Sequence, residues 1–257
     1  MPSSLHASRT ATQVAPDATD CSDLQTPSAV VATGLMLHGP RGLVYGPVDL
    51  TLPVGKLLIV QGPQGAGRSC LLLTLAGRMV PDRGSRLTVL GYDLPKARTR
   101  VQCRAGVAGF AGIDDLDESV RVADIVRERL AWLAPWSHRV PKVTQRTFAE
   151  LAEPIWGDRP VPRIATMIWD LDEVDAMLLR ITLAMAQHPD LLLVDDVDQV
   201  HDSVRRQLVW SRLEALVRPG TTVIASVSSL GEAAAMSWTS SPHQFHLSTA
   251  PHEVQDA

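Results

Sequence analysis

The sequence lacks the features that define several broad classes of protein. Its three cysteines, at positions 21, 70 and 103 of 257, form no C-x-x-C pair, which excludes a disulfide framework and a zinc ribbon. No apolar run approaches the roughly 20 residues needed to cross a bilayer. Basic residues are not in excess, since 24 Lys and Arg against 28 Asp and Glu give a net charge of −4. Proteins that coat nucleic acid are usually strongly basic, so we expect no nucleic-acid partner.

What is present is typical of a globular domain, with 45% hydrophobic and 20% charged residues. Residues 1–29 are rich in Ser, Thr, Ala, Pro and Asp, which predicts a disordered N-terminal tail. The first ten residues carry no apolar segment for export, so we expect a cytoplasmic protein. We expect an organised domain over residues 30–237 and a C-terminal tail over 238–257, in which residues 243–248 favour one short edge strand.

Buried strands and helices alternate along this domain. Leu57–Val60, Leu191–Val194 and Thr221–Val227 are continuous apolar runs, which are typical of strands buried on both faces. Apolar residues at helical spacing, interrupted by a section rich in Pro and Trp, predict a helical insertion over about 115–188. The sequence therefore predicts an α/β fold, in which a parallel sheet is covered on both faces.

A glycine-rich loop follows the first of these strands, and an apolar helix follows the loop from about Ser69. Glycines let successive backbone N–H groups converge on an anion, and the helix directs its positive end to the same place. The pattern G-x-x-x-x-G-K-[ST] is met except that Arg68 stands where Lys is expected. The alternative is a glycine-rich turn that only joins strand to helix. We predict a phosphate-binding loop formed by Gly62, Pro63, Gln64, Gly65, Ala66, Gly67, Arg68, Ser69 and Cys70.

One hydroxyl and two carboxylates complete the predicted site. Ser69 offers its hydroxyl to a phosphate-bound Mg²⁺, and Asp195, at the end of a buried strand, is predicted to hold the same ion through water. Asp196 is the candidate general base that polarises the attacking water; the alternative is that both aspartates only cap a turn. The guanidinium of Arg68 is a planar fork and not a point charge, so we expect binding to survive and phosphoryl transfer to suffer.

From Val30 to Met236 the order of these features resembles the ATP-binding cassette (ABC) family of transport ATPases. The resemblance depends on Gly62–Ser69, on Leu191–Asp196, on the distance between them, and on Leu171–Pro189. It implies a P-loop NTPase (RecA-like) fold with a parallel-sheet core, an antiparallel β subdomain and a helical insertion. It also implies ATP and Mg²⁺ as cofactors, a multi-span membrane subunit as partner, a homo- or heterodimer with another cassette, and a place at the inner face of the membrane.

The chain departs from the family pattern where the family's chemistry lies. The loop glutamine should fall near Ala111 or Gly112, neither of which has a polar side chain. The L-S-G-G-Q signature, which caps the nucleotide of the opposing subunit, aligns with Leu171–Asp175. We expect its carboxylates to repel a γ-phosphate and Val174 to block close approach to the backbone. The switch histidine aligns with Ser228.

Further departures concern the base and the adenine contact. The usual glutamate base aligns with the shorter Asp196, and the aspartate loop keeps only Asp202. The ring that stacks on adenine falls at His38, with Tyr45 as a nearby substitute. Because nucleotide-holding elements are partly kept and hydrolytic ones are lost, the resemblance implies a degenerate cassette, a pseudo-ATPase or a very slow ATPase. A P-loop small-molecule kinase and a non-transport nucleotide-binding scaffold remain alternatives.

Four tryptophans lie in or beside the helical insertion, at positions 132, 136, 156 and 169. In the family this region receives a short helix from the membrane subunit, and an exposed Trp would make a good anchor for it. The alternative, which we favour from the sequence, is that these residues pack in the insertion's own core.

Overall fold

The computed structural model describes residues 27–135, 137, 140–217, 220–229, 231, 236 and 238–248. Most of the predicted N-terminal tail, and Trp136, therefore lie outside the described residues. Along the chain the elements are β1 (Ser28–Gly39), β2 (Gly42–Pro53), β3 (Leu57–Gln61), α1 (Arg68–Leu75), β4 (Arg86–Val89), β5 (Tyr92–Leu94), α2 (Arg98–Arg104), β6 (Ala105–Ala108), α3 (Val122–Leu133), α4 (Gln145–Trp156), η1 (Ile168–Asp170), α5 (Glu173–Met185), β7 (Leu191–Val194), η2 (Val197–Gln199), α6 (Ser203–Val217), β8 (Thr222–Val227) and β9 (His243–His246).

A parallel sheet forms the centre of the molecule, with the strand order β6-β7-β8-β3-β9. Every pairing in it is parallel, as the continuous apolar runs predict. The strand β8 lies between β3 and β7, and the loops that follow these three strands meet at the carboxyl edge of the sheet. Ligands of open α/β sheets bind at this edge.

Alternate side chains of the central strands are buried on opposite faces. Leu57 and Ile59 of β3 contribute to a core shared with α3, α4, α5 and α6. Leu58 and Val60 of the same strand contribute to a second core, shared with α1 and the antiparallel strands. A strand that is covered on both sides has no polar face, which explains why the alternation typical of half-buried strands is missing.

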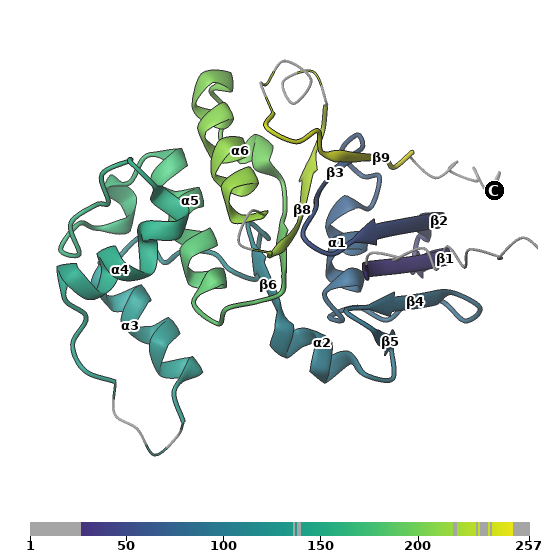
Figure 1. The fold of residues 1–257 in the computed structure, drawn as a ribbon, viewed down its shortest axis with the longest axis horizontal. Helices are drawn as coiled ribbons and strands as arrows, with labels where there is room; N and C mark the ends of the chain where they lie inside the picture. The colour runs from purple at the N-terminus through teal and green to yellow at the C-terminus, as the bar shows by residue number, and fades with distance from the viewer. Residues whose placement is uncertain are drawn as a thin grey trace, which may run out of the picture.

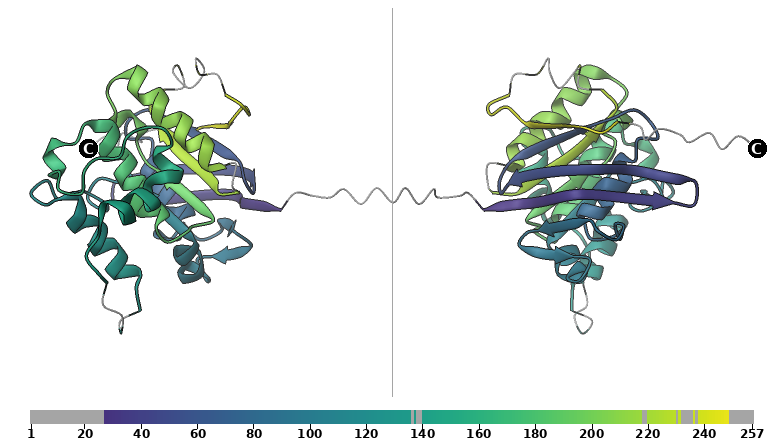
Figure 2. Two further views of the ribbon diagram at one scale, coloured as in Figure 1. Left: turned by 60° about the vertical axis from the view of Figure 1, so that its left-hand side comes forward. Right: turned by 90° about the vertical axis from the view of Figure 1, so that its right-hand side faces the viewer.

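An antiparallel sheet covers the second core, with the strand order β2-β1-β4-β5. Figure 1 shows it on one side of the parallel sheet, with helices α3, α4 and α5 on the other. In the right-hand view of Figure 2, β1 and β2 form a long hairpin. The three parts that the resemblance implies, a parallel core, an antiparallel subdomain and a helical region, are therefore all present.

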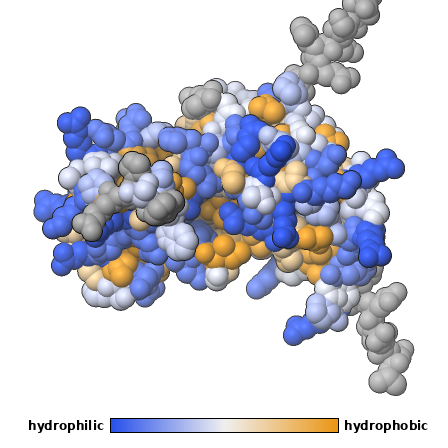
Figure 3. Space-filling model, turned by 90° about the horizontal axis from the view of Figure 1, so that it is seen from below, coloured by the Kyte–Doolittle hydropathy of each residue, from blue (hydrophilic) through white to orange (hydrophobic). Residues whose placement is uncertain are grey.

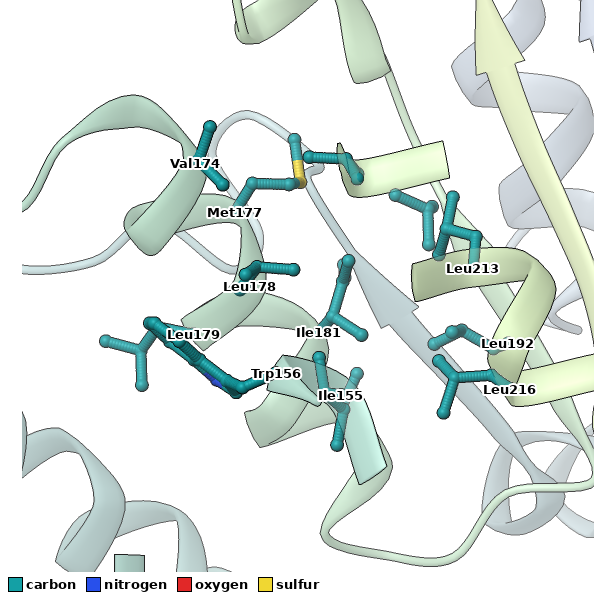
Figure 4. Packing of buried hydrophobic residues seen from close by; sticks show 14 of the residues in the cluster. Ile155, Trp156, Val174, Met177, Leu178, Leu179, Ile181, Leu192, Leu213 and Leu216 are labelled. Carbon is teal, nitrogen blue, oxygen red and sulfur yellow. The ribbon is translucent and has the colours of Figure 1, made fainter. Parts of the chain in front are cut away.

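The helical region has its own apolar interior, in which Trp156 is 1% exposed. Its indole N–H donates to the Thr182 hydroxyl at 3.1 Å, and the ring of Phe148 contacts it edge-on at 6.4 Å between centroids. Figure 4 shows side chains of α4, α5, α6 and β7 meeting in this core. Trp132 and Trp169 are 79% and 60% exposed, so the expectation that they would pack in this core is wrong for both.

The chain beyond residue 237 adds a strand to the central sheet. The predicted edge strand at 243–248 is confirmed as β9, which pairs with β3, and Leu247 is buried with its N–H donating to the Gln61 carbonyl. Part of the segment expected to be a C-terminal tail thus belongs to the domain. None of the described helices has the length and apolar composition that crossing a bilayer requires.

The two tryptophans of opposite exposure allow a matched test of the helical core. We expect Trp156→Ala to lower the free energy of unfolding by about 3–5 kcal/mol, because it empties a packed site and removes the partner of Thr182. Trp132→Ala should change it by less than about 0.5 kcal/mol. Denaturant unfolding of both variants measures the difference, and equal losses would contradict the assignment of Trp156 to the core.

Candidate functional site

The glycine loop joins β3 to α1 at the carboxyl edge of the parallel sheet. Gly65 and Gly67 have φ angles of +86° and +83°, and α1 begins directly afterwards at Arg68. The cap residue Gly67 provides no side-chain cap, and the first turn of α1 has no acidic residue. The N–H groups of this turn, which a helix cannot satisfy internally, therefore remain available to an anion.

Gly67 is required for a second reason, since it lies against the neighbouring hairpin. A Cβ atom at this position would be 2.5 Å from the Val44 carbonyl oxygen, whereas a Cβ atom at Gly65 would meet no atom within 4 Å. Gly62 is similarly confined, because its Cβ would be 2.6 Å from the Leu247 oxygen. Packing thus fixes the two ends of the loop and leaves space at Gly65.

Arg68 turns its guanidinium toward the loop that follows β7. Its Nη2 lies 3.6 Å from Asp196 Oδ1 and its Nη1 lies 3.7 Å from Asp198 Oδ2. The side chain is only 12% exposed, and Nη1 is buried without a hydrogen-bond partner. A buried N–H of a cation that lacks an acceptor is costly, so this group is suited to receive a further anion.

The predicted metal ligands lie at the same edge of the sheet. Ser69 is exposed in the first turn of α1, and Asp195 is 4% exposed after β7. The Ser226 hydroxyl donates to Asp195 Oδ1 at 2.5 Å and accepts from the Asp196 N–H at 2.8 Å. Burial, and secondarily the charge of Asp195, raise the pKa of the Cys70 thiol.

These residues fit an Mg²⁺ ion that arrives with a phosphate ligand. Among the described residues, no group of three or more His, Cys, Asp or Glu side chains is arranged to hold a metal ion. Mg²⁺ usually keeps several waters and takes one or two protein ligands in addition to the phosphates of its substrate. One hydroxyl and one carboxylate are therefore sufficient here only if phosphate oxygens supply further ligands.

The base candidate Asp196 adopts a left-handed backbone conformation, with φ +48°. Burial raises its pKa, and the positive charge of Arg68 opposes that change. A raised pKa favours a general base, but a guanidinium 3.6 Å away competes for the same carboxylate oxygen. The geometry therefore occupies Asp196 with a cation.

The two candidates for the adenine contact differ sharply in exposure. The His38 side chain is 54% exposed, and Asp82 accepts from its backbone N–H and lies 2.6 Å from its ring Nδ1. The hydrogen bond from His38 lowers the pKa of Asp82. Tyr45 is fully buried, its hydroxyl donates to Thr74, and burial raises its pKa to about 12. Tyr45 is a core residue, so it cannot substitute for His38 at a surface site.

At the loop-glutamine position, the polar contacts come from neighbouring residues. Asp114 accepts from the N–H groups of Gly109 and Phe110, which fixes the turn after β6. The Gln199 amide reaches back to the Gly109 carbonyl at 2.6 Å and accepts from Arg180. Gln199 thus bonds this loop to η2, although it lies far away in the sequence.

The segment at the signature position is neutralised by the chain itself. Asp172 caps α5, and Arg159 forms ion pairs with Asp172 at 3.0 Å and with Asp175 at 2.7 Å. Hydrogen bonds from His201 lower the pKa of Glu173. Val174 is 1% exposed within the helical core, so the expectation that its side chain would obstruct the backbone is wrong. The expected repulsion of a γ-phosphate by three carboxylates is therefore too strong, because Asp172 and Asp175 are paired with the guanidinium of Arg159.

Asp198 belongs to the site but sequence reasoning missed it. It contacts Arg68, accepts from Arg206 at 2.8 Å, and accepts from the Ser228 backbone N–H. The signal was present in the sequence, because Asp198 is the third acidic residue in four positions after a buried strand. Asp202 instead caps α6 through the Arg205 N–H.

The two glycines of the loop give a matched test of its geometry. Gly65→Ala should cost about 1–2 kcal/mol, because it adds only the strain of a left-handed conformation. Gly67→Ala should cost about 1–3 kcal/mol more, because its methyl group also meets the Val44 carbonyl. Denaturant unfolding measures both, and a Gly67 variant as stable as the Gly65 variant would show that the loop is not pressed against β2.

No family model matches the chain. Its sequence is similar to Nod factor export ATP-binding protein I of Cupriavidus metallidurans, at 29% identity over 201 residues that cover 77% of this chain and 61% of that protein. The protein of the same name from a Rhizobium species is 30% identical over 193 residues, which cover 74% and 60%. The chain thus spans about three fifths of the length of these relatives.

Solved structures show the same fold. A nucleotide-free ATP-binding cassette from an ABC transporter superposes with a TM-score of 0.67 at 12% identity, covering 86% of this chain and 88% of that chain. For cbiO1 from Clostridium perfringens, part of the ABC transporter complex cbiONQ, the TM-score is 0.64 at 14% identity, with 79% and 80% covered. The chain is therefore related to ABC ATP-binding proteins, and its fold is that of an ABC ATP-binding cassette with a P-loop NTPase core.

Proposed function

We propose that this chain is the ATP-binding subunit of an ABC-type membrane transport complex, and that it hydrolyses ATP slowly or not at all. The observation that carries the nucleotide proposal is the buried Arg68 Nη1 without a hydrogen-bond partner, beside the uncapped first turn of α1. Together they offer N–H donors without acceptors, which a phosphate chain would satisfy. The relatives are named for Nod factor export; this supports the transport role and leaves the cargo open.

Most of the predicted residues have a role in this proposal. Backbone N–H groups of Gly65, Gly67 and the first turn of α1 would hold the phosphates, because the N–H groups of Gly62 and Ala66 already donate to carbonyls and Pro63 has none. The Ser69 hydroxyl would hold the accompanying Mg²⁺, and Asp195 would hold it through water. The ring of His38, oriented by Asp82, stacks on the base. Bound Mg²⁺ supplies charge neutralisation of the phosphates.

Weak hydrolysis is supported by what surrounds the base position. Asp196 shares its carboxylate with Arg68, and the position of the switch histidine is Ser228, whose N–H is bonded to Asp198. Asp196 is then not free to orient a water molecule on the terminal phosphate, and Ser228 lacks the imidazole of the switch histidine. We propose that nucleotide occupancy serves assembly or gating, because binding needs only the loop whereas hydrolysis needs these groups as well.

We further propose that the chain dimerises with another cassette and that capping is one-sided. Two carboxylates at the start of α5 are paired with Arg159, so this helix offers no free hydroxyl or glycine to a partner's phosphate. The P-loop has no such obstruction. A second cassette with an intact signature could cap the nucleotide of this chain, but the start of α5 in this chain could not cap the nucleotide of that partner.

A groove between α3 and the parallel sheet supports a membrane-subunit partner. It has a volume of about 410 Å³, which is in the range of specific binding sites. Its apolar lining includes Ile113, Leu116 and Trp132. The charged lining has more acidic than basic side chains, namely Asp114, Asp115, Asp117, Asp124 and Glu128 against Arg78, Arg129 and Arg180. Figure 3, which views the molecule from below, shows separate hydrophobic patches on a mostly hydrophilic surface. Docking here would hold the chain at the inner face of the membrane.

The structure and the relatives favour the transport role over the kinase and scaffold alternatives. The described groove does not include the residues of the phosphate loop, so it is not placed to hold a phosphate acceptor beside them. A nucleotide-binding scaffold would use the same phosphate loop, and the names of the relatives, which refer to export, favour the transport role over it.

Nucleotide binding is tested by thermal unfolding with and without Mg-ATP. At a concentration of about 100 times Kd we expect about 2.7 kcal/mol of stabilisation, or a rise in Tm of about 5–10 °C. Ser69→Ala should remove the Mg²⁺-dependent part of this rise, while Ser211→Ala on α6 should not. Phosphate release measured in the same samples should stay near background. An unchanged Tm at saturating Mg-ATP would overturn the proposal.

The membrane partner is tested by co-purification from membranes with identification of the captured proteins. We expect a multi-span membrane protein to be recovered with the unaltered chain. Truncation of an anchoring Trp typically costs 2 kcal/mol or more, so Trp132→Ala should lower recovery about 30-fold. Trp169→Ala is the control, because Trp169 is also exposed but does not line the groove. Equal recovery with both variants would exclude this groove as the docking site.

A further inference from the structure

Asp198 connects three parts of the candidate site. Its Oδ2 lies 3.7 Å from Arg68 in the phosphate loop and accepts from the Ser228 N–H after β8, and its Oδ1 accepts from Arg206 of α6. The side chain is 20% exposed, so these charges act with little screening by water. A residue of η2 thus reaches the one side chain of the phosphate loop that carries a charge.

Arg68 is attracted by two carboxylates but not hydrogen-bonded to either. The distances of 3.6 Å to Asp196 and 3.7 Å to Asp198 exceed hydrogen-bond length. The orphaned Nη1 shows that these partners leave the guanidinium unsatisfied. The charges of Asp196 and Asp198 therefore attract the guanidinium of Arg68 toward η2.

The positive charge of Arg68 is already balanced by the carboxylates beside it, although its Nη1 still lacks a hydrogen-bond acceptor. Asp196 and Asp198 face two guanidinium groups, those of Arg68 and Arg206, so the charges of these four side chains already balance. The cation at position 68 of a P-loop reaches the β- and γ-phosphates. A γ-phosphate would have to draw Arg68 from its carboxylates and then remain beside them. A diphosphate, seated on backbone N–H groups, brings less charge to this end of the site.

We propose that Asp198 is a specificity-determining residue that makes the site favour a nucleoside diphosphate over a triphosphate. Asp198 acts by holding Arg68 away from the position of the terminal phosphate and by repelling that phosphate directly. The inference rests on the proposed nucleotide site, and it adds that this site retains its product-like ligand.

The test compares Asp198→Asn with the unaltered chain. Affinities for Mg-ADP and for a non-hydrolysable Mg-ATP analogue are measured by calorimetry. The unaltered chain should bind ADP more tightly than the analogue, and the opposite order would overturn the proposed preference. Asp198→Asn should strengthen analogue binding relative to ADP by about tenfold, because one charge near the terminal phosphate is removed. Asp202→Asn is the matched control: it removes one carboxylate from the same loop, and it should leave the ratio unchanged.

The role of Arg68 is measured by repeating the comparison in an Arg68→Ala background. If Asp198 acts in part through Arg68, the change in ratio caused by Asp198→Asn should shrink there. If Asp198→Asn does not fold, Asp196→Asn removes the other carboxylate on Arg68 and should move the ratio in the same direction.

The outcomes separate the two proposals. Binding of neither nucleotide by the folded, unaltered chain would overturn the proposed function, and this inference with it. The chain could instead bind both nucleotides while Asp198→Asn leaves the ratio of the two affinities unchanged, or changes it no more than Asp202→Asn does. Either result would overturn the role of Asp198 and leave the proposed function standing.

Discussion

Because β3, β7 and β8 bury alternate side chains on opposite faces, they must lie inside a layered structure, and their carboxyl ends must emerge at one edge. That constraint brings the glycine loop after β3 within 3.6 Å of Asp196 after β7, although the two segments are far apart in the sequence. The antiparallel sheet then fixes the loop from outside, where Gly67 meets the Val44 carbonyl. The site is thus a consequence of how the sheet is covered.

The sequence was sufficient where a feature depends on neighbouring residues. A continuous apolar run followed by glycines specifies both the strand and the loop of residues 57–69, because strand burial and left-handed conformations are properties of short segments. The short strand β9 could be predicted for the same reason. These parts include most of the proposed phosphate contacts.

The sequence was insufficient where a feature depends on long-range packing. Tyr45 and Trp132 are both aromatic, yet Tyr45 is fully buried and Trp132 is largely exposed, and nothing in their local sequences distinguishes them. The pairing of Arg159 with Asp172 and Asp175 requires a loop to fold back on α5. The contact between Arg68 and Asp198 likewise depends on the order of strands in the sheet, which local patterns do not determine.

The positions where the chain departs from the ABC family pattern, at Arg68, Asp196 and Ser228, are linked by ion pairs and hydrogen bonds. A planar guanidinium at position 68 extends farther than an ammonium and delivers its charge over a wider area, so it can contact carboxylates on η2 that a lysine in the same place would reach less readily. Once Arg68 and Asp198 attract one another, Asp198 also holds the Ser228 backbone at the position where a histidine would have acted. The base position, the switch position and the loop cation are thus parts of a single ion-paired network. The proposed weak hydrolysis and the proposed nucleotide binding would then have the same physical origin, because this network occupies side chains that would act on a γ-phosphate and does not include the N–H groups of the first turn of α1.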